Sequence, residues 1–220
     1  MSAENKNLLC SWSGGKDSCY ALIKAIEMGY VPKVLLNVLN EEGKISRSHG
    51  IPINILQTQA DAIGIPLYTI ASSWNNYEEN FTNALINLKA KYNLNYAVFG
   101  DIDLQPHKDW EEKVCANAGL TTLLPLWQLD RTALVKEMLS NGIETMIISC
   151  NNTLGIKTCG TILTKEVVLD LIQKNIDPCG ENGEFHTLVT NCGLFNKPLV
   201  IEVKKAWEHE NYCFSELSLL

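Results

Sequence analysis

The chain has 220 residues, enough for one large domain or two small ones with a buried core. Hydrophobic residues make up 46% of the chain and charged residues 20%, a globular balance that excludes a disordered or fibrous protein. The 25 acidic and 18 basic residues give a net charge of −7. This charge argues against a protein that wraps nucleic acid, because such binding needs clustered lysine and arginine.

Nothing in the sequence directs the chain to a membrane or to an oxidising compartment. Residues 1–7 are polar and no run of 18 apolar residues occurs, so we expect neither a signal peptide nor a membrane span. The eight cysteines contain no C-x-x-C pair, which disfavours a zinc site or a thioredoxin-type motif. These features predict a cytoplasmic globular protein with reduced cysteines.

Short apolar runs alternate with helical patterns through the first half of the chain. The apolar runs predict strands at residues 8–12, 34–39, 67–71 and 96–99, with helices between and after them. The glycines at the expected ends of three helices are Gly29, Gly64 and Gly119. This spacing predicts an α/β fold with βαβ units, a mainly parallel, doubly wound sheet and right-handed crossovers.

The alternation becomes less regular after about residue 121. We predict a helix over residues 134–139 that ends near Gly142, and a helix over residues 167–172 with Thr164 as its N-cap. Further strands are predicted at residues 145–150, 185–190 and 199–203. These elements predict a smaller mixed α/β domain at residues 123–220, tightly joined to a first domain at residues 1–122.

A glycine-rich segment follows the first predicted strand and opens the first predicted helix: Ser13-Gly14-Gly15-Lys16-Asp17-Ser18. Glycines at such a junction let the backbone approach a ligand, and the N–H groups of the helix terminus then point at an anion. The lysine adds a cation and the serines add hydroxyl donors. The segment is not a Walker A loop, which needs glycine at position 10 and Ser or Thr at position 17. The alternative is a glycine-rich turn that contains a lysine by chance.

Two further segments carry candidate polar residues. His49 lies beside a glycine and a proline before the second helix, where a surface or capping role is an equal alternative. Gly100-Asp101 follows the fourth strand, at the edge where open α/β sheets bind ligands, and its alternative is an Asx turn. Trp110 on the next helix is more typical of a core residue than of a site.

The most unusual segment is Cys179-Gly180-Glu181-Asn182-Gly183-Glu184-Phe185-His186-Thr187. It places two glutamates, a histidine and a threonine around two glycines, just before a predicted strand. Titratable groups this close together are more typical of a binding loop than of a solvated hairpin, which is the alternative.

The hexapeptide SGGKDS resembles the pyrophosphate loop of the N-type ATP pyrophosphatases, the PP-loop superfamily. A wider set of segments resembles the diphthine–ammonia ligase family, in its short prokaryotic-type branch: SWSGGKDSCYAL, SRSHGI, VFGDIDLQPHKDW, LLPLWQLDR and DPCGENGEFHTLVTNCGLF. This resemblance covers most of the chain. It implies a HUP-type pyrophosphatase domain followed by a smaller domain particular to the family.

The resemblance also implies an ATP-dependent ligase of diphthamide biosynthesis that forms a carbon–nitrogen bond. A carboxylate would be adenylated with release of pyrophosphate, and ammonium would then displace AMP. The implied partners are ATP, Mg²⁺ and ammonium. The implied acceptor is either diphthine, a modified histidine of elongation factor 2, or another small carboxylate. We expect no membrane or nucleic-acid partner, and the sequence leaves open whether the chain forms a homo-oligomer.

Roles follow from matching positions. The residues that would hold ATP are those of the Ser13–Ser18 loop, together with Gly100 and Asp101. Those that would contact the substrate are His49, Trp110 and Thr187. Lys16 would offset charge on the leaving pyrophosphate, and Asp17 would help to hold Mg²⁺. From their chemistry rather than from a matching position, Glu181 or Glu184 would hold ammonium and accept its proton, and His186 would orient the acyl group.

Two other functions stay open at this point. One is a PP-loop enzyme that acts on tRNA or on another acceptor, which the negative charge and the lack of a C-x-x-C pair disfavour. The other is an adenine-nucleotide-binding module without catalysis. The intact lysine and aspartate of the loop, together with the polar cluster at residues 181–187, favour catalysis over that module.

Overall fold

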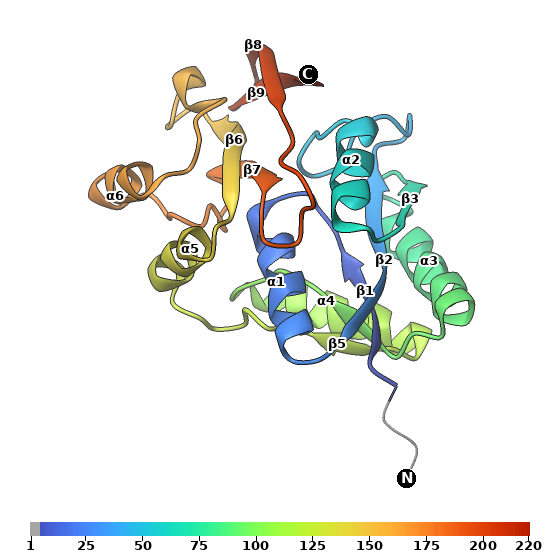
Figure 1. Cartoon of the computed structure of the whole chain (residues 1–220). Helices are drawn as coiled ribbons and strands as arrows, with labels where there is room; N and C mark the ends of the chain where they lie inside the picture. The colour runs from blue at the N-terminus through green and yellow to red at the C-terminus, as the bar shows by residue number, and fades with distance from the viewer. Residues whose placement is uncertain (1–4) are drawn as a thin grey trace.

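The computed structural model describes residues 5–220, and its first half is built around a parallel sheet (Figure 1). The strands of this sheet are β1 (Asn7–Ser11), β2 (Val31–Leu39), β3 (Leu67–Ala71), β4 (Tyr96–Val98) and β5 (Thr121–Leu123). They are arranged in the order β3-β2-β1-β4-β5, and every pair is parallel. The chain therefore reverses its direction of winding next to β1, as in a doubly wound sheet.

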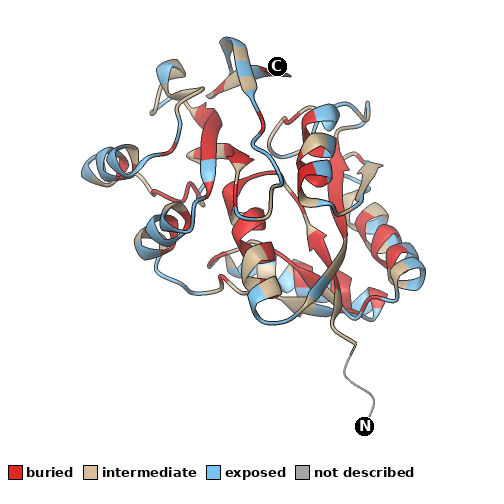
Figure 2. Cartoon of the chain, in the orientation of Figure 1, coloured by how far each residue is buried: buried red, intermediate tan, exposed pale blue. Residues whose placement is uncertain are grey.

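Helices cover both faces of this sheet. They are α1 (Lys16–Glu27), α2 (Ile53–Ile63), α3 (Tyr77–Tyr92) and α4 (Gln105–Ala118). Neighbouring residues of a strand point to opposite faces, so Leu8 packs with α1 and α2 while Leu9 packs with α3 and α4. Figure 2 shows buried residues along the strands and on the inner sides of these helices. The α/β, doubly wound prediction is confirmed.

Glycine ends the helices where the sequence predicts it. Gly29, Gly64 and Gly119 have φ angles of +83°, +78° and +67°, a conformation that glycine adopts without steric cost. The predicted N-cap Thr164 also accepts a hydrogen bond from the backbone N–H of Val167, at 3.3 Å. No helix within residues 5–220 combines the length and the apolar character needed to cross a membrane.

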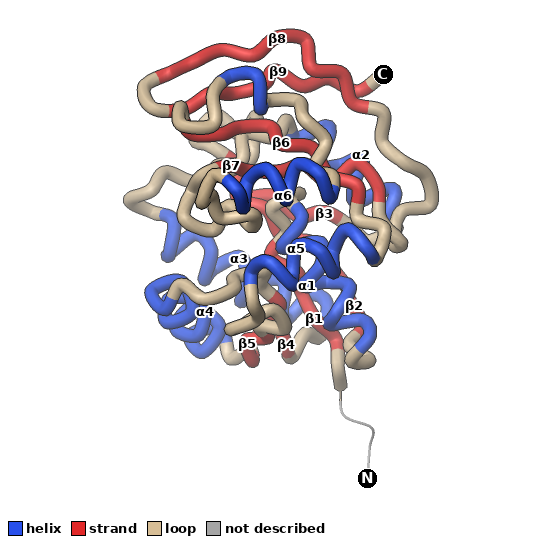
Figure 3. Tube along the Cα trace, turned by 90° about the vertical axis from the view of Figure 1, so that its left-hand side faces the viewer, coloured by secondary structure: helices blue, strands red, loops and turns tan. Residues whose placement is uncertain are grey.

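The second half of the chain forms an antiparallel sheet in the order β7-β6-β9-β8. Its elements are α5 (Arg131–Ser140), β6 (Glu144–Asn151), the 3-10 turn η1 (Ile156–Thr158), α6 (Lys165–Gln173), β7 (Phe185–Asn191), β8 (Ile201–His209) and β9 (Tyr212–Leu219). In Figure 3 these strands lie above those of the parallel sheet.

The hairpin of β8 and β9 is longer than predicted, and β9 is absent from the prediction. Most residues of β8 are exposed or half-buried, so the strand has no continuous apolar run for a pattern to detect. Cross-strand pairs hold it instead. The rings of Trp207 and Phe214 stack with centroids 5.8 Å apart, and Lys205 lies 3.4 Å from Glu216. The short strand β5 was also missed.

A buried glutamine joins the two sheets. Gln59, on α2, is fully buried and its Nε2 donates to the backbone oxygens of Gly14, at 3.0 Å, and Val189, at 2.8 Å. Its Oε1 accepts from the indole N–H of Trp12 at 3.0 Å. The Val189 N–H itself donates to the Gly14 oxygen at 2.9 Å. The glycine-rich loop is therefore held between α2 and β7.

We predict that Gln59→Ala lowers the free energy of unfolding by about 3 kcal/mol, because it removes three buried hydrogen bonds and opens a cavity. Urea unfolding followed by circular dichroism measures the change. The matched control is Gln57→Ala on the same helix, where the side chain is exposed. Equal losses in the two variants would contradict the structural role of Gln59.

Candidate functional site

The glycine-rich loop forms the turn between β1 and α1. Gly14 has φ +84°, which turns the chain sharply before the helix begins at Lys16. The hydroxyl oxygens of Ser13 and Ser18 lie 2.9 Å apart, and the Gly15 N–H donates to the Ser13 hydroxyl at 3.2 Å. The loop thus closes on itself and presents the start of α1, as expected for an anion-binding loop.

Two glycines allow close backbone approaches around this loop. A Cβ on Gly15 would lie 2.9 Å from Nε2 of His49 and 3.1 Å from the backbone oxygen of Thr187. A Cβ on Gly100 would lie 2.7 Å from backbone atoms of Asp17 and Ser18. Gly100 therefore lets the segment after β4 touch the start of α1.

A cavity of about 800 Å³ opens over the loop, within the size range of small-molecule sites. It is lined by the start of α1, the segment from β4 into α4, and residues 179–187. The predicted residues that line it are Ser13, Lys16, Asp17, Ser18, His49, Gly100, Asp101, Trp110, Glu181, His186 and Thr187. The fold therefore brings together segments that are far apart in the sequence.

Three predicted residues do not line the cavity within the described part of the chain. Gly14 and Gly15 are not among its lining residues, and their backbone shapes the turn before α1. Glu184 instead holds its own turn: its carboxylate accepts hydrogen bonds from the backbone N–H and the side-chain amide of Asn182, at 3.0 and 3.2 Å. A catalytic role for Glu184 stays a prediction, and its contacts favour a local structural role.

Trp110 and Thr187 each have contacts beyond the cavity. Trp110 packs against Tyr77 and Phe81, with ring centroids 5.6 and 5.2 Å apart, as its alternative assignment to the core predicts. The Thr187 hydroxyl accepts a hydrogen bond from the backbone N–H of Lys16 at 3.1 Å. Thr187 therefore links β7 to the first turn of α1.

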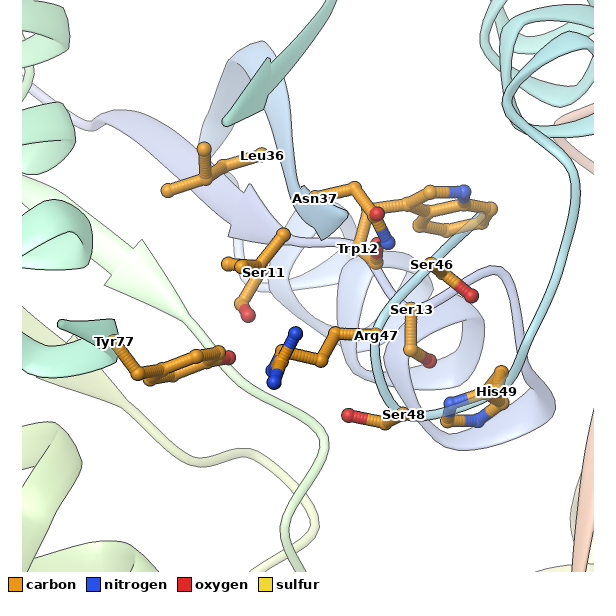
Figure 4. A pocket seen from close by; sticks show the side chains of 11 residues that line it. Ser11, Trp12, Ser13, Leu36, Asn37, Ser46, Arg47, Ser48, His49 and Tyr77 are labelled. Atoms are coloured by element: carbon orange, nitrogen blue, oxygen red, sulfur yellow. Dashed lines mark hydrogen bonds between the residues drawn. The ribbon is translucent and has the colours of Figure 1, made fainter. Parts of the chain in front are cut away.

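A smaller cavity of about 110 Å³ lies at the ends of β1 and β2. Figure 4 shows Arg47 and Tyr77 reaching toward one another across it. The Arg47 guanidinium lies over the ring of Trp74, 4.6 Å from its centroid, and donates to the backbone oxygen of Ser72 at 2.7 Å. Arg47 is not among the predicted site residues, although it belongs to the SRSHGI segment.

Unpartnered polar atoms are concentrated at these two cavities. Among the described residues, six buried side-chain N or O atoms have no hydrogen-bond partner. Five of them belong to residues that line the cavities: Asp17 Oδ1, Asn37 Oδ1, Arg47 Nε, His49 Nδ1 and Glu111 Oε2. Buried polar groups in folded proteins are nearly always hydrogen-bonded, so these surfaces suit contact with a polar ligand.

Lys16 is a buried cation at the cavity floor. Its Nζ lies 2.9 Å from the Asp17 carboxylate and donates to the backbone oxygen of Cys179. Burial opposes its charge, but Asp17, then Cys179 and Glu181, outweigh that effect and raise the pKa of Lys16. Lys16 is therefore charged at neutral pH.

His49 and His186 form a pair beside the loop, with ring centroids 4.5 Å apart. Burial, followed by the charge of Lys16, lowers the pKa of His186 to about 4. Burial, then His186 and Lys16, also lowers the pKa of His49 well below its usual value. Both imidazoles are therefore neutral at neutral pH, and each offers one donor and one acceptor.

Acidic side chains face the cavity from α4 and from residues 179–187. Glu111 is only 3% exposed, and burial, followed by a hydrogen bond to Asp101, raises its pKa to about 11. Burial, then Asp17 and Asp101, raises the pKa of Glu181 to about 7. His107 Nδ1 lies 2.7 Å from the Asp101 carboxylate, which raises the pKa of His107. Glu111 and His107 were not predicted, although both closely follow the acidic turn at Asp101.

Arg131 ties the two sides of this acidic region together. Its guanidinium donates to Asp103 at 2.8 Å, beyond β4, and to Asp177 at 2.6 Å, before the 179–187 segment. Asp177 in turn accepts the backbone N–H of Glu181 at 2.9 Å. The position of Glu181 therefore depends on an ion pair that sequence spacing does not reveal.

The fold and the loop define the class of this protein: a doubly wound α/β nucleotide-binding protein of the PP-loop type. The model of the diphthamide synthase N-terminal domain matches residues 6–122, and that of the diphthamide synthase C-terminal domain matches residues 130–217. The chain belongs to the diphthamide synthase family. This finding confirms the resemblance predicted from the sequence.

Related proteins agree with this assignment. The diphthine–ammonia ligase of Schizosaccharomyces pombe is 29% identical over 90% of this chain, which spans 36% of that protein's length. The diphthine–ammonia ligases of Mus musculus and Homo sapiens are each 27% identical over 94% of this chain, which spans 87% of theirs. These names bear out the prediction of an enzyme of the ligase class.

Solved structures match as well, among them the "predicted subunit of tRNA methyltransferase" from Methanocaldococcus jannaschii. It has a TM-score of 0.47 and 16% sequence identity, and the match covers 85% of this chain and 98% of that one. A likeness this distant does not bear on the function of the chain.

We predict that Glu111→Gln becomes progressively more stable than the wild type as pH rises from about 5 to 8. The unfolded glutamate loses its proton near its usual pKa of 4.5, while the folded one keeps it until about pH 11. The folded state then binds more protons, so wild-type stability falls by about 1 kcal/mol per pH unit relative to the glutamine variant. Urea unfolding at several pH values measures this. A stability difference that does not change with pH would contradict the protonated state of Glu111.

Proposed function

We propose that the chain is an ATP-dependent ligase that activates a carboxylate by adenylation and joins it to ammonia. The observation that carries the proposal is the Ser13–Ser18 loop, which opens into the large cavity with the charged Lys16 at its floor. A phosphate-binding loop alone would support many nucleotide-binding functions. The family of the chain, and the names of the relatives that it matches, support the ligase among them.

ATP would lie across both cavities. Its β- and γ-phosphates would lie at the N-terminus of α1 and accept hydrogen bonds from backbone N–H groups of the loop, as anions do at helix N-termini. Lys16 would offset their negative charge. The adenosine would extend toward the smaller cavity, where Asn37 Oδ1 and Arg47 Nε supply an unpartnered acceptor and donor. Gly100 would keep the segment after β4 close to the phosphates.

Asp17 is the residue that fits Mg²⁺. Its Oδ1 has no hydrogen-bond partner, and Mg²⁺ is commonly held by one or two carboxylates together with substrate phosphates. No group of three or more His, Cys, Asp or Glu side chains in residues 5–220 is placed to hold a metal by itself. The chemistry that Mg²⁺ supplies when bound is neutralisation of charge on the departing pyrophosphate.

The reaction would proceed in two steps. The acceptor carboxylate attacks the α-phosphorus of ATP, and pyrophosphate leaves. The positive charge of Lys16 stabilises the negative charge that develops on this leaving group. Ammonia then attacks the acyl carbon, and AMP leaves. His186 lines the same cavity as Lys16 and, as a neutral imidazole, can hold the acyl group by a hydrogen bond without adding charge. His49, whose ring centroid lies 4.5 Å from that of His186, would fix its orientation.

We propose diphthine on elongation factor 2 as the acceptor, following the names of the relatives. The cavity of about 800 Å³ supports this choice, because it can hold a triphosphate and still admit the end of a long modified side chain. A free small carboxylate is the second acceptor to test.

We predict that Lys16→Ala and Asp17→Ala each lower the rate of AMP release at least about 100-fold, the scale of losing an electrostatic contact to a transition state. The assay follows AMP and pyrophosphate from labelled ATP, with ammonium and either diphthine-bearing elongation factor 2 or small carboxylates. Lys24→Ala, on the same helix but outside the cavity, is the control. Near wild-type rates in the loop variants would overturn the assignment, and a pure nucleotide binder would release no pyrophosphate at all.

A further inference from the structure

Three acidic side chains of the cavity wall lie close enough together to influence each other's charge. Asp101 follows β4, Glu111 lies on α4, and Glu181 precedes β7; all three line the cavity and influence each other's charge. An acidic cluster in a protein is often only a solvated surface. This one is different, because Glu111 is 3% exposed and its Oε2 has no hydrogen-bond partner.

The protonation states of the cluster suit a small cation that donates hydrogen bonds. Glu111 is neutral at neutral pH and shares a hydrogen bond with Asp101, and its buried Oε2 has no other partner, so the group offers hydrogen-bonding capacity without charge. Asp101 is ionised, since its hydrogen bonds to His107 and Glu111 outweigh its burial and lower its pKa. One carboxylate, one neutral acceptor and a glutamate that changes charge near neutral pH therefore surround the same space.

A hydrogen-bonded path leads from this cluster to solvent. Asp101 bridges Glu111 to His107, and His107 lies one helical turn before Glu111 on α4. The side chain of His107 is 58% exposed at the wall of the cavity. A proton that reaches Asp101 can thus pass to an imidazole in contact with water.

We propose that ammonium binds among Asp101, Glu111 and Glu181, and that the Asp101–His107 pair carries protons from this site to solvent. The inference rests on the proposed function, which makes ammonium the nitrogen donor. It adds the residues that hold the ion and a route for its protons. Asp101 and Glu181 supply the charge that attracts ammonium, and Glu111 supplies an uncharged oxygen for a third N–H.

The proton balance of the reaction requires such a route. Ammonium has no lone pair, so it must lose one proton before its nitrogen can form a bond to the acyl carbon. The nitrogen loses a second proton after that attack, when the carbon–oxygen bond to AMP breaks and the amide forms. Glu181 accepts the first proton, because its pKa of about 7 places it between its two charge states at neutral pH. Asp101 and His107 then pass protons on to water.

The charged groups around His107 are compatible with this role. Asp101 contacts it directly, and Glu181, which lines the same cavity, acts on it at longer range. Lys108 is its neighbour on α4 but places its ammonium group over the ring of Trp127, 4.9 Å from the centroid. Both carboxylates therefore favour transient protonation of His107.

The test compares two nitrogen nucleophiles. Ammonium is charged at neutral pH, whereas hydroxylamine is mostly uncharged and needs neither the acidic site nor removal of the first proton. We expect Glu181→Gln to lower kcat/KM for ammonium about 100-fold and His107→Ala about tenfold, the scale of lost acid–base catalysis. Hydroxamate formation from hydroxylamine, with diphthine-bearing elongation factor 2 as acceptor, should change less than threefold. Added imidazole should restore part of the activity of His107→Ala.

The matched controls are Glu112→Gln and His209→Gln. Glu112 is next to Glu111 but its side chain is 55% exposed, and neither residue lines the cavity. Both variants should use the two nucleophiles as the wild type does. Equal losses of kcat/KM with ammonium and with hydroxylamine in Glu181→Gln would overturn the proposal. A variant that differs from the wild type only in the Mg²⁺ concentration it needs would also overturn it, because the cluster would then bind the metal.

A binding measurement separates this inference from the proposed function. Titration of ¹⁵N-labelled ammonium, followed by NMR, should show a bound ion in the wild type and in Glu112→Gln but not in Glu181→Gln. If the wild type binds ammonium but releases no AMP with any acceptor, the site stands and the proposed function fails. If the wild type releases AMP but shows no bound ammonium, the proposed function stands and the inference fails.

Discussion

The attachment of the phosphate-binding loop to strand β7 is the interaction on which the rest of the structure depends. The backbone oxygen of Gly14 accepts hydrogen bonds from both Gln59 and Val189, and the first N–H of α1 is bonded to Thr187. These bonds fix the antiparallel sheet over the carboxyl edge of the parallel one. Without them the 179–187 segment would have no defined position relative to Lys16, and the cavity would lose one of its walls.

The same attachment sets the electrostatics of the site. Because β7 covers the loop, Lys16 is buried beneath Phe185 and lies close to Asp17. The ion pair with Asp17 keeps the lysine protonated although it is buried. Burial, assisted by this positive charge, keeps the adjacent imidazoles of His49 and His186 neutral. The cavity therefore holds a buried cation, two neutral imidazoles and a group of acidic side chains. Such a lining suits a reaction in which an anion leaves and a cation enters.

Apolar runs and helix-ending glycines predicted much of the fold, because the interactions that they report involve residues close together in the chain. Strands such as β1 have a buried apolar centre with clear ends, and Gly64 or Gly119 ends a helix through its own backbone conformation. The β8–β9 hairpin was only partly predicted, since its stability comes from cross-strand pairs such as Trp207 with Phe214. Pairs of that kind become visible only when the register is known.

The sequence by itself determined the family, the doubly wound fold and the loop that would bind phosphate, because these depend on residues that are adjacent in the chain. Only the tertiary structure decided which acidic groups share the cavity. It turned Glu184 toward its own turn and placed Glu111 and His107 beside Asp101. The physical reason is that burial and charge proximity, which set the protonation of a carboxyl, are properties of the packed chain and of no single segment.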